Sequence, residues 1–190
     1  MGKQIYIIHG YGAQPTNHWF PWLKEKLKAD GHQVLIPHMP NSSSPDKEEW
    51  LEALVNEIKN LDSNTYFVAH SLGCITLLKY LEKLDPLPSF GGFILVSGFS
   101  APLPSLPSIS PFTAKKVDGS KIISATNSRA VIAAKDDYIV PFQFSQDLSE
   151  QLNASFYLVE KGGHFLKNDG FITFPLVFDL LNNIIKKSGS

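Results

Sequence analysis

The sequence has a single cysteine, no excess of charge of either sign and no long apolar run. Cys74, the one cysteine among 190 residues, cannot form an internal disulfide, which fits a reducing compartment, and we expect it to fill space on a buried helix face. The 17 Lys and Arg against 18 Asp and Glu leave a formal net charge of -1, which gives nucleic acid or anionic lipid no basic face to bind. No run approaches the roughly 18 to 20 apolar residues of a transmembrane helix, and the first nine residues form a β-type run without the basic start or cleavage site of a signal peptide. We therefore expect a cytoplasmic protein that binds neither nucleic acid nor a membrane.

Metal-binding spacings are also missing. With one cysteine and no His-x-x-x-His or Glu-x-x-His pattern, the sequence gives no support to a zinc site. We predict no metal and no cofactor, and no feature indicates an obligate protein partner. The 43% apolar and 18% charged residues are the composition of an ordinary globular protein with a packed core. A length of 190 residues suits one compact domain, spanning residues 1–190.

Short apolar runs alternate with amphipathic stretches along the chain. The runs predict strands at residues 5–8, 34–37, 65–69, 92–97, 130–134 and 156–159. The amphipathic stretches predict helices at residues 17–30, 46–61, 72–84, 141–152 and 171–187. Strands that are apolar on both faces and alternate with helices are typical of a parallel sheet covered on both sides. The predicted fold class is therefore α/β, with a doubly wound, mostly parallel sheet. Residues 114–128 show no clear pattern beyond a short helix near 120–125.

One strand runs almost directly into a helix at residues 69–73, whose sequence is Ala-His-Ser-Leu-Gly. A small-x-Ser-x-Gly pentapeptide in this context is typical of a nucleophile elbow, in which a strained turn lifts the serine hydroxyl into the crevice beyond the strand. The first position is Ala where the commonest form of the motif has Gly, so the turn must accommodate one methyl group. We therefore predict that Ser71 is a catalytic nucleophile.

A serine hydroxyl is almost fully protonated at neutral pH and needs a base, which in turn needs a partner that fixes its tautomer. In this fold class the order along the chain is serine, acid, histidine. Five of the six histidines precede Ser71, so only His164 remains as the general base. It lies in a Gly-Gly-His-Phe segment just after the last predicted strand, where the glycines allow the loop to bring the ring to the crevice.

The orienting acid is expected at the end of a strand between these two residues. Two adjacent carboxylates, Asp136 and Asp137, follow the predicted strand 130–134, and only one of them can point inward. We favour Asp137, because it starts an Asp-x-x-Val-Pro turn that leads into a helix, as in many proteins of this class. The other carboxylate is then expected to be an exposed turn residue or a backbone cap.

Acyl transfer also needs hydrogen-bond donors for the oxyanion that forms when the serine attacks. The backbone N–H of Leu72 is the first predicted donor, since it opens the helix after the nucleophile. The second is the backbone N–H of Tyr11, which lies between two glycines in the loop after the first strand. His9 and His70 lie beside these turns, and we expect them to be packed or hydrogen-bonded side chains rather than metal ligands or bases.

The Pro/Ser-rich stretch 101–111 follows a strand end and is expected to border the same crevice. Its prolines make it a stiff loop, and Leu103 and Leu106 are predicted to form, with Tyr11, an apolar wall for the substrate. The alternative is that the stretch is a surface connection. No insertion between strands is long enough for a full lid, so we expect a small, open site for short acyl esters.

Five segments together resemble a known family. They are residues 9–12, 17–19, 69–73, 135–141 and 162–165. These segments look like those of the small serine hydrolases grouped with retinoblastoma-binding protein nine and bacterial YdeN, within the α/β-hydrolase superfamily, and the resemblance spans nearly the whole chain. It implies an α/β-hydrolase core without a cap domain, a triad of Ser71, Asp137 and His164, and a hydrolase whose natural substrate is poorly defined. Tyr138 departs from related hydrolases, which often carry Pro there, and this affects only local turn geometry.

Two kinds of function are compatible with these residues. The first, which we favour because all three triad residue types are present, is a serine hydrolase that cleaves a small carboxylic ester through an acyl-enzyme on Ser71. Peptidases and thioesterases use the same machinery, so the sequence does not separate them from an esterase. The second is a protein-binding module that has kept a hydrolase fold with little or no activity, because a fold alone does not assign a function.

Overall fold

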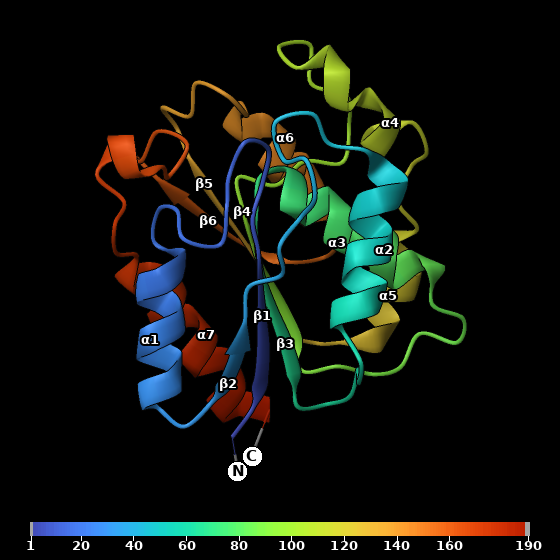
Figure 1. Ribbon diagram of the computed structural model, residues 1–190, viewed down its shortest axis with the longest axis vertical. Coiled ribbons are helices and arrows are strands. Elements are labelled where there is room, and N and C mark those ends of the chain that lie inside the picture. The colour runs from blue at the N-terminus through green and yellow to red at the C-terminus, as the bar shows by residue number, and fades with distance from the viewer. Residues whose placement is uncertain (1, 189–190) are drawn as a thin grey trace.

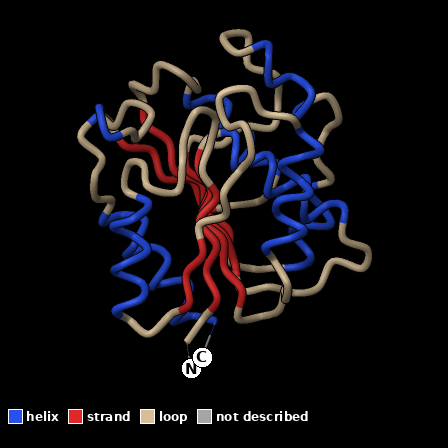
Figure 2. Tube along the Cα trace, in the orientation of Figure 1, coloured by secondary structure: helices blue, strands red, loops and turns tan. Residues whose placement is uncertain are grey.

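The computed structural model describes residues 2–188 and contains one sheet of six parallel strands (Figures 1 and 2). The strands are β1 (Gln4–Ile8), β2 (Gln33–Leu35), β3 (Thr65–His70), β4 (Gly92–Val96), β5 (Arg129–Ala134) and β6 (Ser155–Val159). Their order across the sheet is β2-β1-β3-β4-β5-β6, and every neighbouring pair is parallel. The connections from β1 and β3 leave toward opposite edges of the sheet, and in open α/β sheets ligands bind beyond the carboxyl ends of such a strand pair. The predicted doubly wound parallel sheet is confirmed.

Helices cover both faces of this sheet (Figure 1). One face packs against α1 (Phe20–Ala29) and α7 (Pro175–Ser188). The other packs against α2 (Lys47–Glu57), α3 (Leu72–Lys83), α4 (Ser110–Thr113), α5 (Gly119–Ala125) and α6 (Phe142–Gln151). Two short 3₁₀ helices, η1 (Pro107–Ile109) and η2 (Lys167–Asp169), lie in connecting segments. Within residues 2–188 there is no cap domain, and none of these helices is long and apolar enough to span a membrane.

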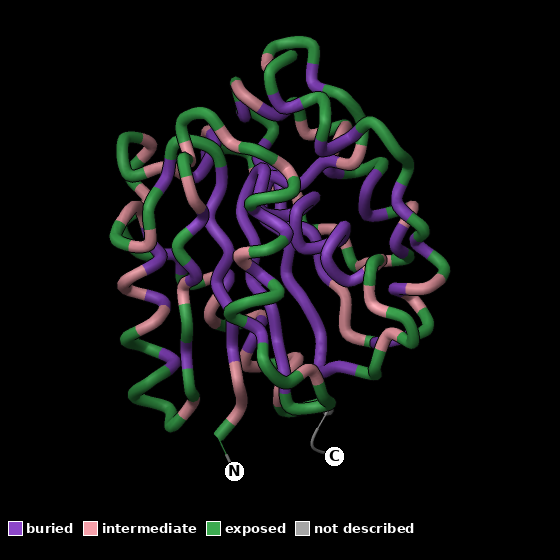
Figure 3. The backbone as a smooth tube through the Cα atoms, turned by 45° about the vertical axis from the view of Figure 1, so that its right-hand side comes forward, coloured by how far each residue is buried: buried purple, intermediate pink, exposed green. Residues whose placement is uncertain are grey.

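The central strands are apolar on both sides because both sides pack against helices. In β3, Phe67 and Ala69 belong to the core cluster that includes α2, α3 and α6, whereas Tyr66 and Val68 belong to the cluster that includes α1 and α7. This alternation follows from the two-residue period of a strand. Figure 3 shows the central strands as the buried centre of the molecule. Cys74 is fully buried in α3, which confirms its predicted place in the core.

Five segments differ clearly from the sequence prediction. Helix α1 begins at Phe20 rather than at residue 17, and β2 ends at Leu35 rather than at residue 37. The closing helix begins at Pro175 rather than at residue 171, because a residue that precedes a proline is disfavoured in the helical region; η2 and a turn at Gly170, with φ 94°, come before it. Proline is favoured at a first helical position, where its missing N–H would be unpaired in any case. Helix α2 ends earlier than predicted, since Ile58 already has an extended backbone. The Pro/Ser-rich stretch is not a loop throughout, because its last part enters η1 and α4. The short helix expected near 120–125 is present as α5.

Candidate active site

Ser71 is the only residue between β3, which ends at His70, and α3, which begins at Leu72. Its backbone angles are φ 54° and ψ -123°, and a positive φ is strained for a residue other than glycine. The N–H of Ser71 donates to the carbonyl oxygen of Val96 at 2.9 Å, which ties the turn to the end of β4. This turn therefore has the backbone strain and the position in the sheet that a nucleophile elbow requires.

Two glycines allow the backbone to pack closely around this turn. A Cβ atom at Gly73 would lie 2.6 Å from the carbonyl oxygens of both Ile8 and His9, where β1 ends. A Cβ atom at Gly10 would lie 2.9 Å from the Cβ of Ser71. Contacts this short are repulsive, so the packing requires glycine at both positions. The loop after β1 can consequently lie directly against the strand-to-helix turn.

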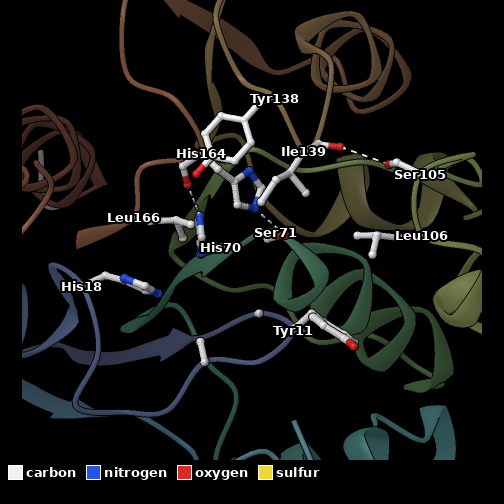
Figure 4. A pocket seen from close by; sticks show the side chains of 12 residues that line it. Tyr11, His18, His70, Ser71, Ser105, Leu106, Tyr138, Ile139, His164 and Leu166 are labelled. Carbon is white, nitrogen blue, oxygen red and sulfur yellow. Dashed lines mark hydrogen bonds between the residues drawn. The ribbon is translucent and has the colours of Figure 1, made fainter. Parts of the chain in front are cut away.

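The side chains of Ser71, His164 and Asp137 form a continuous hydrogen-bond chain. The Nε2 of His164 lies 2.9 Å from the Oγ of Ser71, and its Nδ1 lies 2.9 Å and 3.1 Å from the two carboxylate oxygens of Asp137. Because Nδ1 faces a carboxylate, it carries the ring proton and donates it, which leaves Nε2 to accept the hydrogen bond from the serine hydroxyl. All three residues are at least 92% buried. Figure 4 shows the ring of His164 directed at Ser71.

Asp137 is held in its orientation by three further donors. Its Oδ1 accepts the backbone N–H groups of Ile139 and Val140, each at 2.9 Å. Its Oδ2 accepts the hydroxyl of Ser97 at 2.7 Å. These three hydrogen bonds hold the carboxylate in the orientation in which it also faces the Nδ1 of His164. Sequence reasoning did not assign a role to Ser97, although its place directly after β4, at the edge where Ser71 also lies, was a usable signal.

The neighbouring carboxylate of Asp136 has a different task. It is exposed, and its Oδ1 accepts the backbone N–H groups of Gly162 at 2.8 Å and Gly163 at 2.9 Å. These two hydrogen bonds lower the pKa of the Asp136 carboxyl. The structure thus places Asp137 next to the histidine ring and gives Asp136 the role of a backbone cap on the loop before the histidine.

A third carboxylate, Asp169, holds the same loop from its other end. Its Oδ2 accepts the backbone N–H groups of His164 and Leu166, both at 3.0 Å, and its Oδ1 accepts the hydroxyl of Tyr138 at 3.2 Å. Sequence reasoning missed Asp169, because an aspartate in a polar turn has no pattern that distinguishes this role from solvent exposure.

His70 and His9 are buried and hydrogen-bonded, as predicted. The Nε2–H of His70 donates to the carbonyl oxygen of His164 at 2.9 Å, and burial lowers the pKa of His70 well below its ordinary value. The Nε2 of His9 accepts the backbone N–H of Met39 at 3.2 Å, and its Nδ1 faces the carbonyl oxygen of Gly10 at 3.1 Å. In the part of the chain from residue 2 to residue 188, no group of three or more His, Cys, Asp or Glu side chains is arranged to hold a metal ion.

A cavity of about 300 Å³ opens onto the serine and histidine. It is lined by Gly10, Tyr11, Ala13, His18, His70, Ser71, Ser105, Leu106, Tyr138, Ile139, His164 and Leu166. Tyr11 and Leu106 therefore lie where the sequence analysis expected them. The expectation for Leu103 is corrected: it is only 3% exposed and belongs to the core. The chain turns between Leu103 and Leu106, with a hydrogen bond from the N–H of Leu106 to the carbonyl oxygen of Leu103 at 3.0 Å, so that one leucine packs inward and the other lines the cavity.

The two residues predicted to supply backbone donors, Leu72 and Tyr11, directly follow Ser71 and Gly10, which both line the cavity. Leu72 is the first residue of α3, and a first helical N–H has no partner within its own helix. Tyr11 lines the cavity next to Gly10, and Figure 4 shows its ring extending away from Ser71.

A parallel sheet covered on both faces, with a serine on a strand-to-helix turn and an aspartate and a histidine on later loops, is the α/β-hydrolase arrangement. The chain belongs to the serine hydrolase family, whose model matches residues 5–183. The resemblance stated from the sequence is confirmed.

Relatives agree with this assignment. The chain is 52% identical to YdeN of Bacillus subtilis (strain 168) over 187 residues, which covers 98% of each chain. The crystal structure of the ydeN gene product from B. subtilis matches with a TM-score of 0.94 over 97% of this chain and 99% of that one. Serine hydrolase RBBP9 of Rattus norvegicus is 25% identical over 83% of each chain. The mouse alpha/beta hydrolase domain-containing protein 10, at 16% identity, matches with a TM-score of 0.72 over 98% of this chain and 92% of its own, and this likeness concerns the fold.

Proposed function

We propose that this serine hydrolase cleaves small carboxylic esters through an acyl-enzyme on Ser71, with His164 as general base and Asp137 as the acid that orients it. The observation that supports the proposal most strongly is the hydrogen-bond chain of 2.9 Å from serine to histidine and 2.9 Å from histidine to aspartate. A serine hydroxyl is a weak nucleophile without a base. A buried histidine of defined tautomer provides that base.

Acylation begins when the Oγ of Ser71 attacks the carbonyl carbon of the ester and its proton passes to the Nε2 of His164. Asp137 accepts the Nδ1–H throughout and stabilises the imidazolium that forms. His164 then gives the proton to the departing alkoxide, so that the ester C–O bond breaks and the acyl group stays on Ser71. Water then attacks the acyl carbon while Nε2 takes its proton; the bond between the acyl carbon and the Oγ of Ser71 breaks, and His164 returns the proton to Oγ, which releases a carboxylic acid and restores the serine hydroxyl.

Negative charge develops on the carbonyl oxygen in both steps. We assign its stabilisation to the backbone N–H groups of Leu72 and Tyr11, because fixed donors aimed at a developing charge contribute a large share of catalysis. The close approach of the loop after β1 supports this assignment, since a Cβ atom at Gly10 would lie only 3.3 Å from the backbone nitrogen of Leu72.

The cavity suggests a short substrate. Its volume of about 300 Å³ is at the lower end of the range for ligand pockets. Tyr11 and Leu106 offer apolar contacts to a short acyl or alcohol chain. Small-molecule esters with short chains are therefore the proposed substrates.

A fluorophosphonate probe tests the nucleophile. Wild type should be labelled, Ser71→Ala should not, and Ser124→Ala, which alters an exposed serine on α5, should be labelled like wild type. Labelling that persists in Ser71→Ala would overturn the assignment.

Hydrolysis of p-nitrophenyl esters, thioesters and aminoacyl amides should be compared in the same proteins. We expect a preference for short-chain esters, and hydrolysis of long-chain esters alone would contradict it. A folded wild type that is neither labelled nor active would favour the protein-binding alternative.

A further inference from the structure

His18 lines the catalytic cavity but takes no part in the hydrogen-bond chain of Ser71, His164 and Asp137. It precedes α1, and it lies across the cavity from Leu106. Figure 4 shows its ring pointing from the edge of the cavity toward the middle, below His70. This polar ring thus lines the same cavity as Ser71 and can contact a ligand bound there.

The protonation of this ring follows from its partner. The backbone N–H of Lys167 donates to the Nδ1 of His18 at 2.9 Å, so Nδ1 is unprotonated. Burial lowers the pKa of His18, the nearby His164 lowers it further, and Asp169 opposes these effects. The ring is therefore neutral at neutral pH, and its one proton is on Nε2.

The backbone around His18 fixes the ring in place. His18 has φ 52°, a left-handed conformation that few non-glycine residues adopt. The next residue, Trp19, donates from its indole N–H to the carbonyl oxygen of Phe165 at 3.1 Å. The edge of the His18 ring also meets Phe20, with 5.4 Å between ring centroids. The start of α1 is thus attached at two points to the loop after His164, and the Nε2–H donor is oriented before any ligand arrives.

This donor has no acceptor of its own. Among residues 2–188, no protein atom accepts a hydrogen bond from the Nε2 of His18. Three other polar side chains that line the cavity outside the triad already donate hydrogen bonds within the protein. Tyr138 donates to a carboxylate, and Ser105 and His70 each donate to a carbonyl oxygen. The ring of Tyr11 extends away from the reacting serine (Figure 4). In the described part of the chain, two side-chain donors of this largely apolar wall thus lack a protein acceptor, the hydroxyl of Tyr11 and the Nε2–H of His18, and of these the ring of His18 points toward the middle of the cavity (Figure 4).

We propose that the Nε2–H of His18 is a substrate-recognition donor, and that the preferred substrates are small esters with an additional acceptor oxygen, such as an ether, hydroxyl or keto oxygen, within two or three bonds of the ester group. The inference rests on the proposed ester hydrolysis at Ser71. An unpaired donor at the wall favours a chain that offers it an oxygen over a purely aliphatic chain of equal size, because the aliphatic chain removes water from the donor and returns no hydrogen bond.

Two isosteric ester pairs test the proposal. The acyl pair is p-nitrophenyl methoxyacetate and p-nitrophenyl butyrate, and the alcohol pair is 2-methoxyethyl acetate and butyl acetate. In each pair one ether oxygen replaces one methylene group. The quantity measured is the ratio of kcat/KM for the ether ester to kcat/KM for the alkyl ester. The two esters of a pair differ in intrinsic reactivity, but this difference is the same for wild type and for every His18 variant. A change in the ratio between these proteins therefore reports recognition of the ether oxygen.

Three substitutions separate recognition from loop structure. His18→Asn retains an acceptor at the place of Nδ1 for the N–H of Lys167 and tolerates a left-handed backbone, but it does not reach into the cavity. His18→Phe removes both ring nitrogens. His18→Gln extends an amide N–H to about the place of Nε2. We expect the ratio for at least one pair to fall about 3- to 10-fold in both the Asn and the Phe variants, and to recover in part in the Gln variant.

The outcomes distinguish this inference from the proposed function. If wild type hydrolyses these esters through Ser71 but both ratios are unchanged in the Asn variant, the recognition role of His18 is wrong and the proposed function stands. A fall in the Phe variant alone would also overturn it, because the effect would then come from the lost bond to Lys167. If wild type hydrolyses none of the four esters, or Ser71→Ala hydrolyses them equally well, the proposed function fails and this inference fails with it.

Discussion

The turn that carries Ser71 and the loop that carries His164 meet at the carboxyl edge of the sheet, yet they are held by different means. The serine turn is fixed by its own backbone. It has a strained positive φ, it is tied to Val96, and two glycines let the end of β1 pack against it. Close packing of backbone atoms leaves little freedom.

The histidine loop depends instead on side chains from elsewhere. Asp136 accepts from the two glycines before the histidine, and Asp169 accepts from the N–H of His164 itself. Asp137 then orients the ring. A steric change should therefore shift the serine turn as a unit, whereas the effect of a hydrogen bond lost from the histidine loop should depend on how directly that bond holds the ring.

The largest effect on kcat is expected for Asp137, the carboxylate that contacts the ring of His164. Asp137→Asn should lower kcat for a short p-nitrophenyl ester by about 10⁴-fold, because an amide does not hold the histidine in the productive tautomer. Asp136→Asn is the matched control, since its amide oxygen can still accept from Gly162 and Gly163, and kcat should fall less than about tenfold. Equal losses in the two variants would contradict the different roles assigned to these neighbours.

Gly10→Ala tests the serine turn. The added Cβ would lie 2.9 Å from the Cβ of Ser71 and 3.0 Å from the carbonyl oxygen of His70, so the turn must shift. We expect a loss of about 100-fold in kcat and about 1–3 kcal/mol in the free energy of unfolding. In Gly31→Ala, where φ is 85° but no atom lies within 4 Å of the new Cβ, stability should fall by about 1 kcal/mol while kcat stays unchanged. Full activity in Gly10→Ala would show that the close approach is not needed.

Asp169→Ala tests the hydrogen bonds of the histidine loop. It removes the acceptor of the N–H groups of His164 and Leu166, and we expect kcat to fall about tenfold, with a loss of about 1–3 kcal/mol in stability. Tyr138→Phe removes only the hydrogen bond to the other carboxylate oxygen and should lower kcat less than about threefold. A variant of Asp169 with normal kcat and reduced stability would make this residue purely structural.

The smallest effect concerns His70, which joins the two regions. It belongs to β3 and donates to the carbonyl oxygen of His164. Its pKa is well below the ordinary value because it is buried, so below about pH 6.5 the unfolded chain binds a proton that the native chain does not. Stability should therefore be complete above that pH and decrease as the pH falls toward the native pKa, by at most about 1.4 kcal/mol per pH unit for this residue.

Thermal unfolding between pH 7 and pH 5 measures this dependence. His70→Gln keeps a donor for the carbonyl oxygen but has no titrating ring, so its Tm should fall less on acidification than that of wild type. Burial also lowers the pKa of His9 and His18, so part of the dependence should remain. An identical dependence in wild type and variant would show that His70 does not contribute to it.

Much of the fold could be predicted from local patterns in the sequence. Residues 66–69 form an uninterrupted apolar run because both faces of β3 are covered, and such a run indicates a covered strand in any chain. The serine turn is equally local, since a short motif and the strand and helix around it define it. The place of His164 and Asp137 along the chain was also predictable, because order along the chain is a property of sequence.

Contacts between distant side chains could not be predicted in this way. Leu103 and Leu106 are similar residues three positions apart, yet only the second lines the cavity. Asp169, Ser97 and His18 gain their positions from partners on other elements, and nothing in their immediate neighbours distinguishes them from ordinary loop residues. The sequence by itself determined the alternation of strands and helices, the serine turn and the order of the candidate catalytic residues, because each depends on neighbours along the chain. Only the tertiary structure decided which carboxylates hold the histidine loop and which side chains face the cavity, because hydrogen bonds and packing between segments far apart in the chain depend on how those segments meet in space.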